Sequence, residues 1–140
     1  MFKITAICLM FAYMTYSHPS GLQSYTVKGK LRCGNEPAKD VVVKLVDDDF
    51  GRDADDMLSE SKTNSAGIFE LSGNTVELTT IDVHLKIYHD CNDAEQCQRR
   101  WKFELPSSYI SKAVNASKVL DIGEWNLEAV MPGESRDCEH

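Results

Sequence analysis

Alternation of apolar and polar side chains is the feature that most limits how this chain of 140 residues can fold. The clearest stretch covers residues 81–88, in which every odd position is apolar and every even position carries a polar group. Residues 25–32 and 100–105 repeat the pattern. A period of two residues is typical of a β-strand with one buried face, and no window of a dozen residues shows a helical stripe. The sequence therefore predicts an all-β protein.

Shorter apolar segments between turn signals predict the remaining strands. They cover residues 41–46, which are apolar at nearly every position and should be covered on both faces, and residues 58–63, 68–71 and 120–129. In the last segment the alternation changes phase at Gly123, so a β-bulge there would keep both halves of the strand facing inward. About seven short strands separated by turns predict a two-sheet β-sandwich with Greek-key connections.

The chain has five cysteines, and an odd number leaves one thiol without a partner if the others form disulfides. The start of the chain offers an explanation. A basic start, an apolar run over residues 4–14 and small or polar residues at Thr15 and Ser17 are typical of a secretory signal peptide. The run is shorter than the ~20 residues that a membrane-spanning helix needs. We therefore expect a signal peptide over residues 1–17, with cleavage near Ser17 or as late as Ser20, and a secreted, extracellular domain over residues 21–140.

Removal of Cys8 with the signal peptide leaves four cysteines, which predicts two disulfides in an oxidising compartment. Their spacing does not fit a zinc site, so we expect no metal ligands and no cofactor. Four cysteines allow three pairings, and proximity in sequence favours Cys91 with Cys97. That choice leaves Cys33, at the end of the first strand, to pair with Cys138.

An N-glycosylation acceptor is present at Asn115, which begins an Asn-Ala-Ser triplet. The triplet lies in the polar stretch 111–118, where a loop is expected between two strands. In a secreted chain this predicts a glycan on Asn115.

The charge balance limits the partners of the chain. The 15 basic and 22 acidic residues give a net charge of −7, and loss of Lys3 with the signal peptide makes it −8, so nucleic-acid binding is not expected. Basic residues nevertheless form rows on the predicted strands. They are a candidate patch for an anionic ligand or, alternatively, charges that only solvate the sheet faces. The members of the patch are Lys28, Lys30, Arg32, Lys86, Arg99, Arg100 and Lys102.

An ordered series of short motifs gives the chain a family resemblance. The motifs are GKLRC (29–33), DDML (55–58), TNSAGIF (63–69), LKIYHDC (85–91), CQR (97–99), LP (105–106) and GESRDC (133–138). On these motifs the chain resembles the nematode transthyretin-like family of secreted proteins, and the match extends over residues 25–138, nearly the whole mature chain. The resemblance implies a transthyretin- or prealbumin-like β-sandwich. For function it implies recognition or carriage of small apolar ligands and lipids, or bridging of cell-surface phosphatidylserine to phagocyte receptors.

An enzymatic function is not expected. Relatives of the transthyretin fold include a hydrolase of 5-hydroxyisourate, whose Tyr-Arg-Gly-Ser tail contributes to the active site, but this chain ends in Arg-Asp-Cys-Glu-His. His84 and His89 have no partner base or nucleophile that the sequence identifies, and no catalytic motif is present. We therefore predict no catalytic residues.

Six aspartates crowd into residues 47–56 and raise the question of calcium. The segment does not fit the EF-hand template, because Gly51 stands at its fifth position and no glutamate stands at the twelfth. We expect a solvated acidic loop rather than a calcium site.

The sequence thus predicts a secreted, non-enzymatic binding module for an extracellular small apolar ligand, lipid or cell-surface partner. The first alternative is a phosphatidylserine-recognising bridge in the engulfment of apoptotic cells, and the second is a structural or matrix-associated protein. We expect a monomer or weak homodimer that does not span a membrane.

Overall fold

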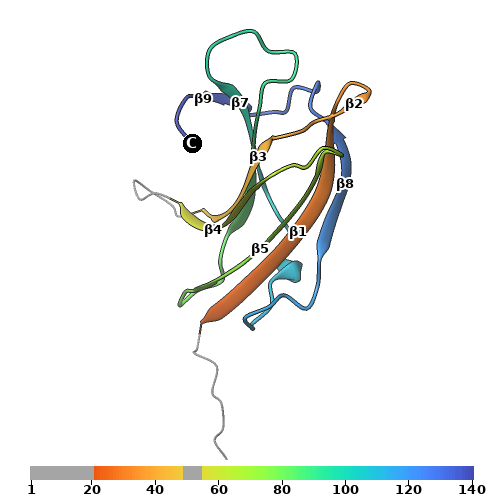
Figure 1. Cartoon of the computed structure of the whole chain (residues 1–140). Helices are drawn as coiled ribbons and strands as arrows, with labels where there is room; N and C mark the ends of the chain where they lie inside the picture. The colour runs from red at the N-terminus through yellow and green to blue at the C-terminus, as the bar shows by residue number, and fades with distance from the viewer. Residues whose placement is uncertain (1–20, 49–54) are drawn as a thin grey trace, which may run out of the picture.

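The structure is a computed structural model that describes residues 21–48 and 55–140. The predicted signal peptide with its cleavage point lies outside the described residues, as does most of the aspartate-rich loop. The described chain forms two β-sheets that face each other across a single hydrophobic core (Figure 1).

The first sheet, called the β1 sheet below, is built around one long strand. β1 (Leu22–Cys33) lies between β5 (Ile68–Val76), with which it is antiparallel, and β8 (Leu120–Asn126), with which it is parallel. The short strand β2 (Glu36–Pro37) folds back on the end of β1. Figure 1 shows β1 as a long strand that runs between β5 and β8.

The second sheet, called the β6 sheet below, is antiparallel throughout, in the order β4-β3-β6-β7-β9. Its strands are β3 (Val42–Asp47), β4 (Asp56–Lys62), β6 (Val83–His89), β7 (Gln98–Glu104) and β9 (Ser135–Asp137). A short 3₁₀ helix, η1 (Ser107–Tyr109), lies between β7 and β8. The predicted all-β sandwich of about seven strands is confirmed, with the two short strands β2 and β9 in addition.

The core is filled by the side chains that the alternation assigned to the inward faces. In β6, Val83, Leu85 and Ile87 are at most 1% exposed, and Trp101 of the neighbouring β7 is fully buried. Each such aliphatic side chain stabilises the fold by about 1.5–3 kcal/mol on transfer from water. The described core is therefore packed with side chains contributed by both sheets.

The predicted bulge in the last strand is also confirmed. Lys28 and Lys30 of β1 face Asp121 and Glu124 of β8, so two residues of β8 lie opposite one residue, Gly29. Gly123 is one of those two and has φ +77°, a conformation that glycine adopts without strain. A Cβ at Gly29 would come within 2.6 Å of the Ile122 side chain, so the missing side chain makes room for it.

Candidate ligand-binding sites

Two disulfides close the same end of the sandwich, but not in the predicted pairing. Cys33 is bonded to Cys91 and Cys97 to Cys138, so the expected Cys91–Cys97 and Cys33–Cys138 bridges are wrong. The physical reason is strand register. Gln98 of β7 pairs with Asp137 of β9, which brings the preceding Cys97 directly opposite the following Cys138. Cys91 follows β6 and is left to join the end of β1, so its disulfide links the two sheets.

A buried ionic cluster lies beside these disulfides, and at its centre is Arg99. Arg99 is 7% exposed, because it shares the inward face of β7 with Trp101. It donates to the backbone oxygens of Cys91, Leu127 and Ala129 at 2.8–2.9 Å and to Oε1 of Glu134 through both Nε and Nη2, at 3.0 and 2.7 Å. All five N–H groups of the guanidinium are thus satisfied. Arg99 therefore cannot belong to an exposed anionic-ligand patch.

Glu134 completes the cluster and was missed by the sequence analysis. Its Oε1 also accepts a hydrogen bond from Trp101 Nε1 at 2.7 Å. Desolvation of the carboxylate opposes its ionisation, but the hydrogen bonds from Arg99 and Trp101 outweigh that cost and lower the pKa of Glu134. The sequence did contain a signal for the cluster. Arg99 is two residues from Trp101 on the same strand, so its side chain points into the core, where a cation needs an acidic partner.

His89 packs edge-on against Trp101 inside the same end, with ring centroids 5.5 Å apart. Burial of the imidazole, reinforced by the charge of Arg99, lowers the pKa of His89 from 6.5 to about 4, so the ring is neutral at physiological pH. Its Nδ1 accepts a hydrogen bond from the Cys91 N–H, and its Nε2 is buried without a partner. The imidazole ring therefore contributes to the packing of this end of the core.

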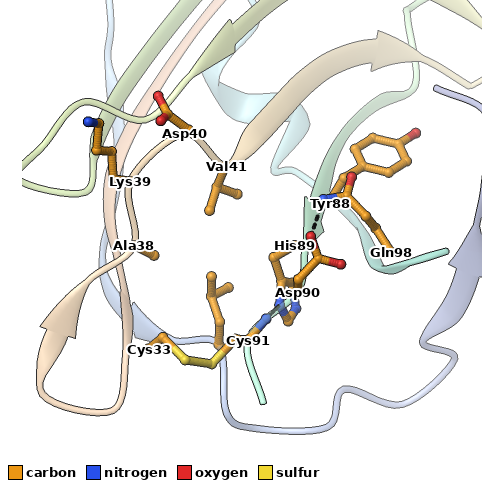
Figure 2. A pocket seen from close by; sticks show the side chains of 11 residues that line it. Cys33, Ala38, Lys39, Asp40, Val41, Tyr88, His89, Asp90, Cys91 and Gln98 are labelled. Carbon is orange, nitrogen blue, oxygen red and sulfur yellow. Dashed lines mark hydrogen bonds between the residues drawn. A yellow bond between two sulfur atoms is a disulfide. The ribbon is translucent and has the colours of Figure 1, made fainter. Parts of the chain in front are cut away.

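A cavity of about 240 Å³ opens beside His89. Figure 2 shows Ala38, Val41 and the Cys33–Cys91 disulfide around its space, with His89 and Asp90 on the opposite side. Typical pockets for drug-sized ligands measure about 300–1,000 Å³, so this hollow is below the usual range. Its volume is small for a lipid chain.

The other predicted cations of the β6 sheet lie on its outer face, and each of them has an acidic neighbour. Lys102 Nζ lies 2.9 Å from Asp48 Oδ1, and Lys86 donates to Asp55. Arg100 lies 3.8 Å from the carboxylate of Asp137, which completes the set of paired cations. Local neutralisation reduces the attraction of this face for an anionic ligand.

Tyr88 belongs to the same outer face, as the alternation predicts, yet it is only 3% exposed. The ring of His140 stacks on it at 4.1 Å, and Lys44 Nζ lies 5.2 Å from its centroid. Burial is the main cause of the raised pKa of Tyr88. The end of the chain therefore covers part of this face.

The predicted cations of the β1 sheet lie on the opposite outer face, so the structure does not bring the seven residues into one patch. Arg32 is engaged, since it donates to the Gly34 oxygen at 2.6 Å and lies 3.6 Å from Glu124. Lys28 and Lys30 make no hydrogen bond or ion pair with any described residue. They line a groove of about 300 Å³ together with Gly29, Ile68, Asp121 and Gly123.

The groove was not predicted, because it depends on the two glycines that meet at the bulge. Ile68 is 47% exposed beside Lys30, its partner across the β1–β5 ladder. An apolar side chain and two cations without partners thus share one depression. The sequence shows the lysine row of β1 and the phase change at Gly123 as two separate features. Only the parallel pairing of β1 with β8 places them side by side and so forms the groove.

The remaining predicted positions lie as follows. Asn115 is exposed in the connection between η1 and β8, so a glycan could be accommodated there. His84 is half-buried on the outer face of the β6 sheet. Among the described residues, no helix has the length and hydrophobicity that crossing a bilayer requires.

The fold and these features define a class: a disulfide-bonded β-sandwich with a buried ionic cluster at one end and hollows on its surface. Comparison with known proteins gives a consistent result. The sequence model of the Transthyretin-like family matches residues 28–106. Transthyretin-like protein 5 of Caenorhabditis elegans is 46% identical over 138 residues, covering 98% of each chain, and Transthyretin-like protein 33 of the same organism is 48% identical over 84% of this chain and 83% of its own.

The chain therefore belongs to the transthyretin-like family. Among solved structures, a 9R-lipoxygenase from Cyanothece PCC8801 aligns with 74% of this chain and 16% of its own, with 19% identity and a TM-score of 0.42. A similarity at that level carries no conclusion about fold or function.

Proposed function

We propose that the protein is a secreted, non-catalytic binding module that recognises the head groups of a lipid surface through the outer face of its β1 sheet. The observation that carries the proposal is the pair Lys28 and Lys30, which have no acidic partner among the described residues and line a groove of about 300 Å³ next to exposed Ile68. A cation near a membrane surface contributes about 1 kcal/mol to attraction by anionic lipids.

The acidic residues around the groove favour a head group that carries both signs of charge. Glu70 lies across from Lys28 on β5, and Asp121 and Glu124 lie across from the two lysines on β8. Phosphatidylserine presents a phosphate, a carboxylate and an ammonium group, so it could satisfy lysines and carboxylates together. This supports recognition of phosphatidylserine, as in a bridging protein of engulfment, over attraction to any anionic surface.

Carriage of a small apolar ligand has less support. The core is filled by the side chains of both sheets, and the cavity beside His89 measures about 240 Å³ and is lined in part by charged residues. A surface groove with an exposed isoleucine suits contact with a membrane better than enclosure of a ligand. Secretion is supported by the two disulfides, which persist in oxidising compartments.

The proposal is tested by sedimentation of the purified protein with vesicles of phosphatidylcholine alone, with phosphatidylserine, or with an equal charge of phosphatidylglycerol. We expect binding to phosphatidylserine vesicles to exceed binding to the other two and to weaken by about tenfold or more in the Lys28→Glu/Lys30→Glu variant.

The matched control is Lys39→Glu/Lys62→Glu, which makes the same charge change at two exposed lysines outside the groove. Equal loss of binding in both double variants would reduce the effect to net charge and contradict the proposed site. Equal binding to phosphatidylserine and phosphatidylglycerol would contradict head-group recognition.

A further inference from the structure

A second surface feature lies on the β6 sheet, far in the fold from the lysine groove. Asp48 directly follows β3, Asp82 directly precedes β6, and His84 is the second residue of β6. One ring nitrogen of His84 and one carboxylate oxygen from each aspartate lie within 4.8 Å of one another. All three side chains are partly exposed, between 13% and 31%, so an ion could enter from solvent.

Backbone hydrogen bonds hold the two aspartates in place. Asp48 N–H donates to the Asp82 backbone oxygen at 2.9 Å, and Asp82 N–H donates to Asp47 Oδ1 at 2.8 Å. The strand register adds to this, because Val46 pairs with His84 in the β3–β6 ladder. The three side chains therefore project from two neighbouring strand ends whose relative position is fixed.

The hydrogen bond of His84 defines which ring nitrogen is free. Nδ1 lies 3.0 Å from the backbone oxygen of Asp82, and a carbonyl oxygen can only accept, so Nδ1 carries the hydrogen. In the neutral imidazole, Nε2 then presents a lone pair. Fixing one nitrogen on a backbone oxygen while the other stays free is the arrangement that orients histidines bound to metal ions.

The free nitrogen faces another electron-pair donor. His84 Nε2 lies 3.7 Å from Asp48 Oδ2, which is beyond hydrogen-bonding distance. When the imidazole is neutral, both atoms are electron-pair donors, and a cation placed between them would be attracted by both. Two ligands of one tetrahedral zinc ion are about 3.3–3.6 Å apart, given bonds of about 2.0–2.2 Å, so a small closure would let both atoms bind the same ion.

From this geometry we propose that Asp48, Asp82 and His84 bind a divalent transition-metal ion, with zinc as the best match. One imidazole and two carboxylates suit zinc better than calcium, which prefers six to eight oxygen ligands. Lys102 does not block the ion, because it contacts Asp48 through the other oxygen, Oδ1. The proposal is independent of lipid binding, since the lysine groove lies on the opposite sheet.

The test is titration of the tag-free, metal-stripped protein with Zn²⁺, followed by calorimetry and by the rise in Tm. We expect one zinc ion per chain with micromolar or tighter affinity, and a loss of at least tenfold in His84→Gln and in Asp48→Asn. Substitution with Co²⁺ should give visible absorption typical of four- or five-coordinate nitrogen and oxygen ligands.

The matched control is His140→Gln. His140 also lies beside an aspartate, with Nδ1 3.6 Å from Asp137 Oδ1, but it is not part of the three-residue set. Unchanged zinc affinity in His140→Gln, with loss in His84→Gln, is the expected result. Zinc binding that is weaker than millimolar, or that persists in both His84→Gln and Asp48→Asn with intact folds, would overturn the proposal.

Discussion

Two regions of this sandwich treat positive charge in opposite ways. At the disulfide-bonded end, Arg99 is buried and has a partner for every N–H group, one of which is the carboxylate of Glu134. On the outer face of the β1 sheet, Lys28 and Lys30 line a groove and have no partner among the described residues. The sequence analysis assigned all three to the same patch.

The difference teaches that the sign of a charge says little about function by itself. What matters more is whether the charged group already has hydrogen-bond and ion-pair partners within the protein. A buried cation with all donors used has no free capacity for a ligand, and its removal leaves an unpaired carboxylate behind. An exposed cation without a partner contributes little to stability and keeps its capacity for an external anion. We therefore expect stability to depend on the disulfide-bonded end and binding on the β1 face.

The largest effect is expected from Arg99→Met. Removal of the guanidinium strands the Glu134 carboxylate and three backbone oxygens in a buried environment, which should lower the free energy of unfolding by about 3–5 kcal/mol. The measurement is urea denaturation with tryptophan fluorescence, since Trp101 belongs to the cluster.

The neighbouring Arg100→Met is the matched control for this prediction. Arg100 is about a third exposed, and its contact with Asp137 is 3.8 Å, so its loss should cost less than about 1 kcal/mol. If both variants lost a similar amount of unfolding free energy, the burial of Arg99 would not explain why the disulfide-bonded end matters for stability.

The next effect in size is expected from removal of the disulfide that joins the two sheets. Cys33→Ser/Cys91→Ser opens a loop with a sequence separation of 58 residues and should destabilise the fold by about 2–4 kcal/mol. Phosphatidylserine binding, measured at a temperature where the variant is folded, should be retained. Peptide mapping without reduction checks the pairing, because a peptide that links Cys91 to Cys97 would contradict it.

Much of the fold was predictable because it depends on local periodicity. The inward residues of β6 and the bulge at Gly123 follow from apolar spacing alone. The disulfide pairing was not predictable in this way, because it depends on β9, a strand of three residues whose pairing with β7 is a non-local event. Proximity in sequence favoured Cys91 with Cys97 because that argument ignored which residues the register brings together.

The candidate sites were less accessible to sequence reasoning. The lysine row on β1 was recognised, but the groove exists only because β8 joins β1 in parallel and places Gly123 beside Gly29. The parity of Arg99 could have excluded it from the patch, since it alternates in phase with Trp101. If the odd or even position along a strand had been considered for charged residues as well as apolar ones, Arg99 would have been assigned to the core and the lysines of β1 to the surface.

The smallest of these effects concerns pH and again separates the buried end from the surface. In the unfolded chain His89 takes up a proton near its ordinary pKa of 6.5, whereas in the folded chain burial, with help from Arg99, lowers that pKa to about 4. Between these values the unfolded state binds more protons, so stability falls as the pH drops from 6.5 towards 4. At about 1.4 kcal/mol per unit of pKa, the loss attributable to His89 is about 2–3 kcal/mol at pH 4.

The variant His89→Gln isolates this contribution. Glutamine can still accept the hydrogen bond from the Cys91 N–H but does not titrate. The wild type should therefore lose stability relative to the variant steadily as the pH falls below 6.5. Above pH 7.5 the difference in unfolding free energy between the two proteins should stay constant. The interval from pH 6.5 to 5 is the informative one, because the pKa of Glu134 lies below its usual 4.5 and that carboxylate stays ionised throughout. If the two curves of unfolding free energy against pH ran parallel across this interval, His89 would take up a proton as readily in the folded chain as in the unfolded chain. That result would contradict the lowered pKa that burial of the ring produces.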